Sequence, residues 1–153
     1  MTGIAAVLRR DGAPAPRAEL RRMMSALEHR GRVAQATLVD CSVGLAQRAS
    51  RDDRSSVPRA LPDGLLVVAD ARLDNRDELR SAGLDLDDDT TEAEVIARAY
   101  ARWSTACVER LLGDFAFVLW DRERRLLLCA RDPLGVRPLY TRTTERGIYV
   151  ASE

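Results

Sequence analysis

The sequence contains no lysine, one histidine and three cysteines. All 24 basic residues are therefore arginine, and 24 acidic residues balance them, so no net charge favours nucleic acid or an anionic membrane as a partner. No apolar run approaches the roughly 18 residues needed to span a bilayer. The first eleven residues lack the basic region and the long apolar stretch of a signal peptide. We therefore expect a cytoplasmic protein that binds neither nucleic acid nor membrane.

The scarce cysteines and the single histidine also bear on redox and metal chemistry. Cys41, Cys107 and Cys129 lie far apart in apolar surroundings and form no CxxC pair, so we expect buried free thiols in a reducing compartment. His29 has no triad pattern or ligand partners around it, and we expect a hydrogen-bonding role at a helix end. The acidic run 85–89 lacks the glycine and the terminal glutamate of a calcium loop. No metal site is expected.

What is present fits one domain over residues 1–153. The hydrophobic share of 46% and the charged share of 31% are typical of a globular chain, and there is no repeat or linker. Apolar spacing predicts an α+β fold with strands near both ends of the sequence. The expected strands are 3–8, 36–39, 43–46, 65–69, 115–120, 125–130 and 148–151, with 136–141 extended. Four helices are expected. One follows Pro16, two cover 76–82 and 106–112, and one runs from Thr91 to Trp103. Residues 47–61 are expected to form a loop.

Two local patterns are specific. Thr91 and Glu94 have the spacing of a capping box, and Ile96, Tyr100 and Trp103 follow on one face, which indicates a core-facing helix. The strands 115–120 and 125–130 form a predicted hairpin and are apolar almost throughout. Strands that are apolar on both faces must be covered on both faces, so the hairpin predicts a sheet inside a layered sandwich.

A strand that begins at residue 2 or 3 permits a chemistry that interior strands lack. Once Met1 is removed, the new terminal amine can act as the base for the hydroxyl of Thr2, which would then be an N-terminal nucleophile. Thr2 is small enough to permit that removal. The alternative interpretation is that Thr2 merely precedes a strand.

Five segments, in the same order, resemble class II glutamine amidotransferases, and in particular the first domain of asparagine synthetases. The most specific segment is Ala130–Tyr140, which is similar to the family's Ala-Arg-Asp-Arg-x-Gly-x-Lys-Pro-Leu-Tyr. The others are Met1–Ala5, similar to Met-Cys-Gly-Ile; Leu27–Gly31, similar to His-Arg-Gly-Pro-Asp; the hairpin Leu112–Asp121; and Val150–Glu153. The resemblance covers the whole chain. It implies a four-layer αββα sandwich of the N-terminal-nucleophile hydrolase type.

The same resemblance implies that the glutaminase site is altered. The family has Cys at the position of Thr2, and an alcohol must lose its proton during attack whereas a thiol is already partly ionised. The family's oxyanion hole is Asn-Gly, and this chain has Asp70-Ala71 there. Losing one such donor costs roughly 3–4 kcal/mol. The Arg that binds the glutamine carboxylate falls at Ala49, with Arg48 beside it as a possible substitute, and the Asp that binds the glutamine amine falls at Glu92. We therefore expect the chain not to hydrolyse glutamine.

The segment Asp70–Leu79 resembles the lasso-peptide macrolactam synthetases, which descend from asparagine synthetase. Those enzymes activate a carboxylate with ATP and close a ring on an amine of the same peptide, so they need no ammonia. Their ATP chemistry belongs to an ATP-pyrophosphatase synthetase domain with a Ser-Gly-Gly-x-Asp-Ser loop, which this chain lacks. We expect no cofactor in this chain, with ATP and magnesium in the missing domain, and a synthetase domain, in cis or in trans, and a precursor peptide as partners.

The sequence is compatible with three functions. The first is a non-hydrolytic domain of such an amide-forming enzyme, with a structural or substrate-binding role, whose segment 131–140 and last strand pack against the synthetase domain. The second is an active glutamine amidotransferase that uses Thr2. The third is a free-standing binding module. A structural ion pair between Arg131 and Asp132 is also expected.

Overall fold

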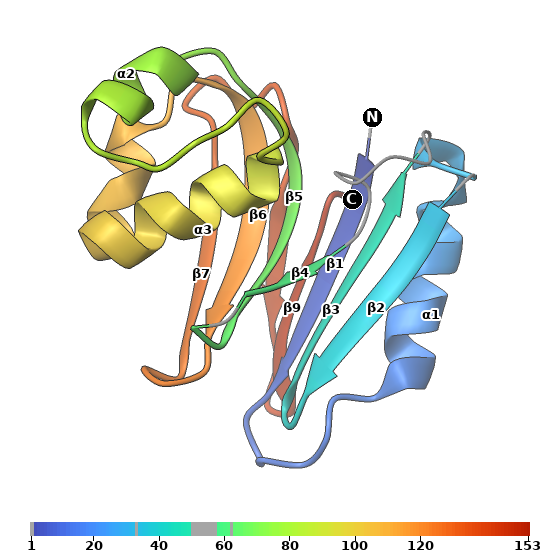
Figure 1. The fold of residues 1–153 in the computed structure, drawn as a ribbon. Coiled ribbons are helices and arrows are strands. Elements are labelled where there is room, and N and C mark those ends of the chain that lie inside the picture. The colour runs from blue at the N-terminus through green and yellow to red at the C-terminus, as the bar shows by residue number, and fades with distance from the viewer. Residues whose placement is uncertain (1, 33, 50–57, 62) are drawn as a thin grey trace.

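A computed structural model describes residues 2–32, 34–49, 58–61 and 63–153. Two antiparallel sheets face each other, with α1 (Arg17–Ala26) on the outer face of one and α2 (Arg76–Ser81) and α3 (Glu92–Trp103) outside the other (Figure 1). The α+β class and the layered αββα arrangement are therefore confirmed. None of the described helices is long and apolar enough to cross a membrane.

The first sheet is built around the amino-terminal strand. Its order is β2-β3-β1-β9-β8, and β1 (Thr2–Arg9) lies between β3 and β9. Ile4 and Ala6 point to the space between the sheets, while Ala5 and Val7 point to α1, as strand alternation requires. The other strands are β2 (Ala34–Asp40), β3 (Val43–Ala49), β8 (Tyr140–Thr143) and β9 (Gly147–Ala151).

The second sheet has the order β4-β5-β6-β7 and contains the expected hairpin. Val118 packs between the sheets and Phe117 packs toward α3, so the strand is covered on both faces, as its apolar sequence predicts. The strands are β4 (Arg59–Ala60), β5 (Leu65–Leu73), β6 (Gly113–Asp121) and β7 (Leu126–Arg131). Several boundaries differ from the prediction. The largest extensions are those of β3 to Ala49 and of β5 to Leu73, because each pairs with a neighbouring strand over its full length. Of the segment expected to be extended over 136–141, only Tyr140 and Thr141 belong to a strand.

The helices follow their sequence signals closely. Thr91 and Glu94 form the predicted capping box, and Ile96 and Tyr100 are buried in the core. The segment expected as a helix over 106–112 is instead a 3-10 helix, η3 (Ser104–Arg110), which begins at a residue with φ of 54°. A second 3-10 turn, η1 (Glu28–Arg30), follows α1.

Two further expectations need correction. Cys107 is buried and Cys129 is half-buried, but Cys41 is exposed, because it lies in the tight β2–β3 turn with φ of 48°. Part of the loop expected over 47–61 belongs to β3 and β4, and residues 50–57 lie outside the described part of the chain.

Candidate active-site remnant

The candidate site lies at the end of the sandwich where β1 begins and where both labelled chain ends are found (Figure 1). Thr2 pairs with Ala49 across β1 and β3, and strand alternation turns both toward the second sheet, on the same side as Ile4. From that sheet, Asp70 points back between the sheets, on the same side as Val68. Thr2 is half-buried and Asp70 is buried.

The carboxylate of Asp70 forms an ion pair with Arg137. The Arg137 Nη1 atom lies 3.5 Å from Asp70 Oδ2, and the two side chains are only 22% and 9% exposed. Burial raises the pKa of Asp70 above its ordinary value of 3.8, although Arg137 and the backbone amide of Thr2 both act to lower it. The ion pair thus places a carboxyl group beside the strand that carries Thr2, where the resemblance implies a neutral amide donor.

The loop after β7 holds Arg137 in place. Both carboxylate oxygens of Asp132 accept backbone amides, from Val136 at 2.9 Å and from Arg137 at 3.0 Å. Gly135, with φ of 69°, closes this turn in a conformation that favours glycine. Asp132 was expected to pair with Arg131; both residues are described, and no ion pair joins them. Asp132 instead caps the loop that presents Arg137.

Burial acts to raise the pKa of Asp132, but backbone hydrogen bonds, chiefly from the amides of Arg137 and Val136, together outweigh it and lower the pKa below 3.8. Asp132 therefore stays ionised at neutral pH and keeps the loop closed. Arg137 was expected only at a domain surface and was missed as a residue of the site. Two signals could have indicated it: an acidic residue at position 70 and a basic residue at the family's Lys position.

Arg48 and Ala49 lie on opposite faces of β3. Arg48 pairs with Gly3, so its side chain points to the outer face of the sheet, and its Nη2 atom donates to Gln35 Oε1 at 2.9 Å. The structure brings Ala49, which has no charge, to the face of Thr2. Arg48 makes no contact with Asp70 or Arg137 in the described structure.

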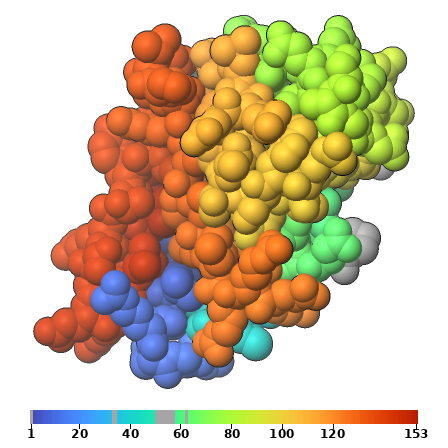
Figure 2. Space-filling model, turned by 90° about the vertical axis from the view of Figure 1, so that its left-hand side faces the viewer, coloured from blue at the N-terminus to red at the C-terminus, as the bar shows by residue number. Residues whose placement is uncertain are grey.

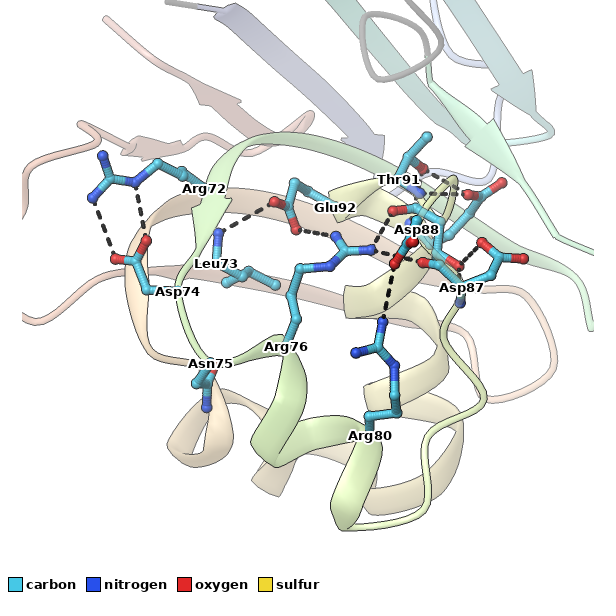
Figure 3. A network of polar contacts seen from close by, with 12 residues as sticks. Arg72, Leu73, Asp74, Asn75, Arg76, Arg80, Asp87, Asp88, Thr91 and Glu92 are labelled. Carbon is cyan, nitrogen blue, oxygen red and sulfur yellow. Dashed lines mark hydrogen bonds and ion pairs between the residues drawn. The ribbon is translucent and has the colours of Figure 1, made fainter.

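Glu92 belongs to a separate network at the start of α3 (Figure 3). Its Oε1 atom accepts the backbone amide of Leu73 at 3.4 Å, and its Oε2 atom accepts Arg76 Nη1 at 3.3 Å. Arg76 also donates through Nη2 to the carbonyl oxygen of Thr90 at 2.7 Å. Burial raises the pKa of Glu92, while the Leu73 amide and Arg76 act to lower it. Glu92 thus joins the end of β5 to the start of α3, and no contact links it to Asp70 in the described structure.

The segment 70–79, which carries the macrolactam-synthetase resemblance, has clear structural roles. Ala71 lies within β5 and packs toward α3. Asn75 donates through Nδ2 to the Arg110 carbonyl at 2.9 Å and accepts the Leu112 amide at 3.1 Å. Arg72 pairs with Asp74 at 3.2 Å on the surface (Figure 3). The segment therefore fastens the turn between β5 and α2 to the segment that precedes β6.

The end of β9 closes the other side of the site. His29 Nε2 lies 2.9 Å from Glu153 Oε1, and Arg30 Nε donates to the same oxygen at 2.6 Å. The expected helix-end role of His29 is confirmed. Gly31 lets this turn approach β3, since a Cβ there would lie 2.3 Å from the backbone carbon of Ala49. Among the described residues, no group of His, Cys, Asp and Glu could hold a metal ion.

Comparisons with known proteins show which proteins this chain is similar to. A Mycobacterium tuberculosis protein described as a glutamine-hydrolysing asparagine synthetase is 40% identical over 100 residues, which are 63% of this chain and 15% of that protein. Asparagine synthetase 3 of Bacillus subtilis is 45% identical over 67 residues, 44% of this chain and 11% of the relative. The chain thus spans a small fraction of the length of these relatives.

The solved structure of B. subtilis glutamine phosphoribosylpyrophosphate amidotransferase matches 99% of this chain and 42% of that chain, with a TM-score of 0.77 and 17% identity. This likeness shows the fold. The family described as the glutamine amidotransferase domain matches residues 1–153. The chain therefore belongs to the glutamine amidotransferase domain family and is similar to a part of asparagine synthetases.

Proposed function

We propose that this chain is a non-hydrolytic glutaminase-like domain of an asparagine-synthetase-type, ATP-dependent amide-forming enzyme. The observation that carries the proposal is the buried Asp70, which points toward the Thr2 end of β1 and pairs with Arg137 at 3.5 Å. Amide hydrolysis develops negative charge on the carbonyl oxygen, and active sites stabilise it with preorganised donors. An ionised carboxylate offers only acceptors and would repel that charge.

The remaining positions support the same proposal. Thr2 has an alcohol in place of a thiol, and Ala49 brings no cation to the Thr2 face. The oxygens of Glu92 are engaged by Leu73 and Arg76. Each of these features weakens either the nucleophile or the binding of glutamine. We infer that the chain keeps the fold without the hydrolysis.

The role that remains is to support a synthetase domain, in cis or in trans. The segment from the end of β7 to the first residue of β8 exposes three large apolar side chains: Leu134 at 90%, Val136 at 52% and Tyr140 at 60%. Contiguous exposed apolar surface marks interaction sites. ATP and magnesium would bind to the synthetase domain. Within this class we propose a macrolactam synthetase acting on a precursor peptide, which rests on the resemblance of the segment 70–79.

One observation favours a second candidate, an active glutaminase. Thr2 is the first residue of β1 and is half-buried at the open end of the sandwich, where removal of Met1 would free its amine. The two candidates differ in the source of nitrogen. A glutaminase would make the complete enzyme depend on glutamine, whereas a non-hydrolytic domain would not.

The experiment assays amide formation by the complete enzyme, with its peptide or small-molecule amine, in the presence and absence of glutamine. We expect equal rates in both conditions and an unchanged rate for Thr2→Ala. Thr2→Ser is the matched control, because it keeps the hydroxyl. Dependence on glutamine that disappears in Thr2→Ala and persists in Thr2→Ser would establish the second candidate instead.

A further inference from the structure

The edge strand β8 differs from the other edge strands in that all of its residues are exposed. All four of its residues, Tyr140–Thr143, are exposed, so neither face of the strand is covered. It ends the sheet order, and none of the described strands pairs with its outer edge. Native proteins protect such edges with proline, lysine, a bulge or a covering segment. The only charged side chain on β8 is Arg142. The sequence of the strand, Tyr-Thr-Arg-Thr, favours strand formation.

The register shows which backbone groups are available. Thr144 donates its amide to the Gly147 carbonyl at 2.9 Å, and the pairing continues with Thr143 opposite Ile148. Bonded and non-bonded pairs alternate along an antiparallel ladder, so Arg142 and Tyr140 bond to β9. The amides and carbonyls of Thr141 and Thr143 therefore point outward, spaced as an added strand requires.

A groove of about 700 Å³ lies beside this edge, on the outer face of the sheet. Tyr140, Tyr149, Ala151 and Met23 of α1 line it, and Arg142 and Arg146 lie at its sides. Helix α1 packs over β1 and β3 and leaves the groove uncovered. Arg142 and Arg146 form no ion pair within the described part of the chain. Glu145 and Glu153 also line the groove, and Glu153 is paired with His29 and Arg30. The groove therefore offers an apolar floor flanked by charges of both signs, among which Arg142 and Arg146 form no ion pair with a described residue.

Both sheets end on this side of the molecule. The segment 132–139 connects the edge strand β7 of one sheet to the edge strand β8 of the other and carries the exposed Leu134 and Val136. Figure 2 shows the orange and red segments from β7 to β9 sharing one face. The exposed apolar side chains Leu134 and Val136 thus lie on the segment that leads directly into the open edge strand β8.

We infer that β8 is a docking edge to which an extended segment of the synthetase-type polypeptide adds as a sixth strand. This inference rests on the proposed function and names the place where the partner binds. The segment would bond to the backbone of Thr141 and Thr143, place an apolar side chain in the groove, and bring an acidic residue to Arg142 or Arg146. This chain covers 15% or less of the asparagine synthetases compared above, so most of each of those proteins lies outside the matched region. A segment of that remaining polypeptide is therefore the proposed partner of β8.

The test uses the complete enzyme, or this chain mixed with the synthetase-type polypeptide encoded in the same genome. Thr141→Pro removes one outward amide and no bond to β9, and edge strands tolerate proline. Thr141→Val is the matched control, because it keeps the amide and a β-branched side chain. Far-ultraviolet circular dichroism and tryptophan fluorescence verify that both variants fold. Binding in trans is measured by calorimetry, and exchange of the Thr141 and Thr143 amides by nuclear magnetic resonance.

We expect slower exchange at Thr141 and Thr143 when the synthetase polypeptide is present, roughly tenfold weaker binding for Thr141→Pro, and native binding for Thr141→Val. A complex in which both amides exchange freely, and which the proline variant forms normally, would overturn the docking edge and leave the proposed function intact. Failure of the native chain to form any complex would overturn both.

Discussion

The ion pair between Asp70 and Arg137 permits a quantitative test of the site. Two unit charges 3.5 Å apart attract by about 5 kcal/mol at an effective dielectric constant of 20. Desolvation of the buried Asp70 offsets much of this attraction. Arg137 keeps 22% of its side chain exposed, which reduces the value further. We therefore expect a coupling free energy of about 1–3 kcal/mol in a double-mutant cycle.

The cycle consists of Asp70→Asn, Arg137→Gln and the double variant, each unfolded in urea at pH 7 and followed by tryptophan fluorescence. Arg137→Gln should destabilise the fold more than Asp70→Asn, because it leaves a buried carboxylate without its cation. A coupling below about 0.5 kcal/mol would show that the two side chains do not interact in solution.

The pH dependence gives the same test a second readout. Because the pKa of Asp70 is raised in the folded state, the native chain holds this proton more tightly than the unfolded chain does. Asp70 therefore contributes stability at low pH that is lost as the pH rises from 3.8 through its raised pKa. Without Arg137 the pKa of Asp70 should rise further, so the Arg137→Gln variant should lose more stability than the native chain as the pH rises above 3.8. When Asp70→Asn is present in both backgrounds, this difference between them should disappear.

Three further predictions concern the scaffold. Phe117 is fully buried, so Phe117→Ala should lower the free energy of unfolding by about 3–5 kcal/mol, and an unchanged melting temperature would contradict the assignment of this strand to the core. Thr91→Ala removes the cap of α3 and should cost about 1 kcal/mol in urea denaturation, whereas Thr91→Ser should restore most of it. Burial raises the pKa of Cys107 and Cys129 to about 11, so a thiol reagent should label the exposed Cys41 first in the folded protein, and equal rates for all three cysteines would contradict the structure.

The fold was predictable from the sequence where apolar runs and capping signals are local. The short apolar run at β1, the continuous apolar hairpin and the capping box at Thr91 each specify one local structure. The end of β5 was not predictable in this way, because Asp70 and Ala71 are poor strand formers. Pairing with β6 over nine residues overrides that propensity.

The site was predictable only in part. The replaced positions could be located by motif, but the contact between Asp70 and Arg137 spans two distant segments and leaves no local pattern. Side chains alternate between the two faces of β3, so Arg48 and Ala49 point to opposite faces. The sequence alone could not show which of the two faces Thr2, because this segment was expected to be a loop. The prediction for Cys41 was wrong because its apolar neighbours Val39 and Val43 belong to strands, whereas Cys41 itself turns outward.

The most direct test of the central claim is the release of ammonia from L-glutamine by the purified chain. The mature amino terminus is first established by mass spectrometry, so that a free Thr2 amine is known to be present, and the complete enzyme is assayed in parallel. The account predicts no release above the level of the Thr2→Ala variant, in either preparation. Steady release of ammonia that Thr2→Ala abolishes would show that the domain is an active glutaminase and would contradict the account.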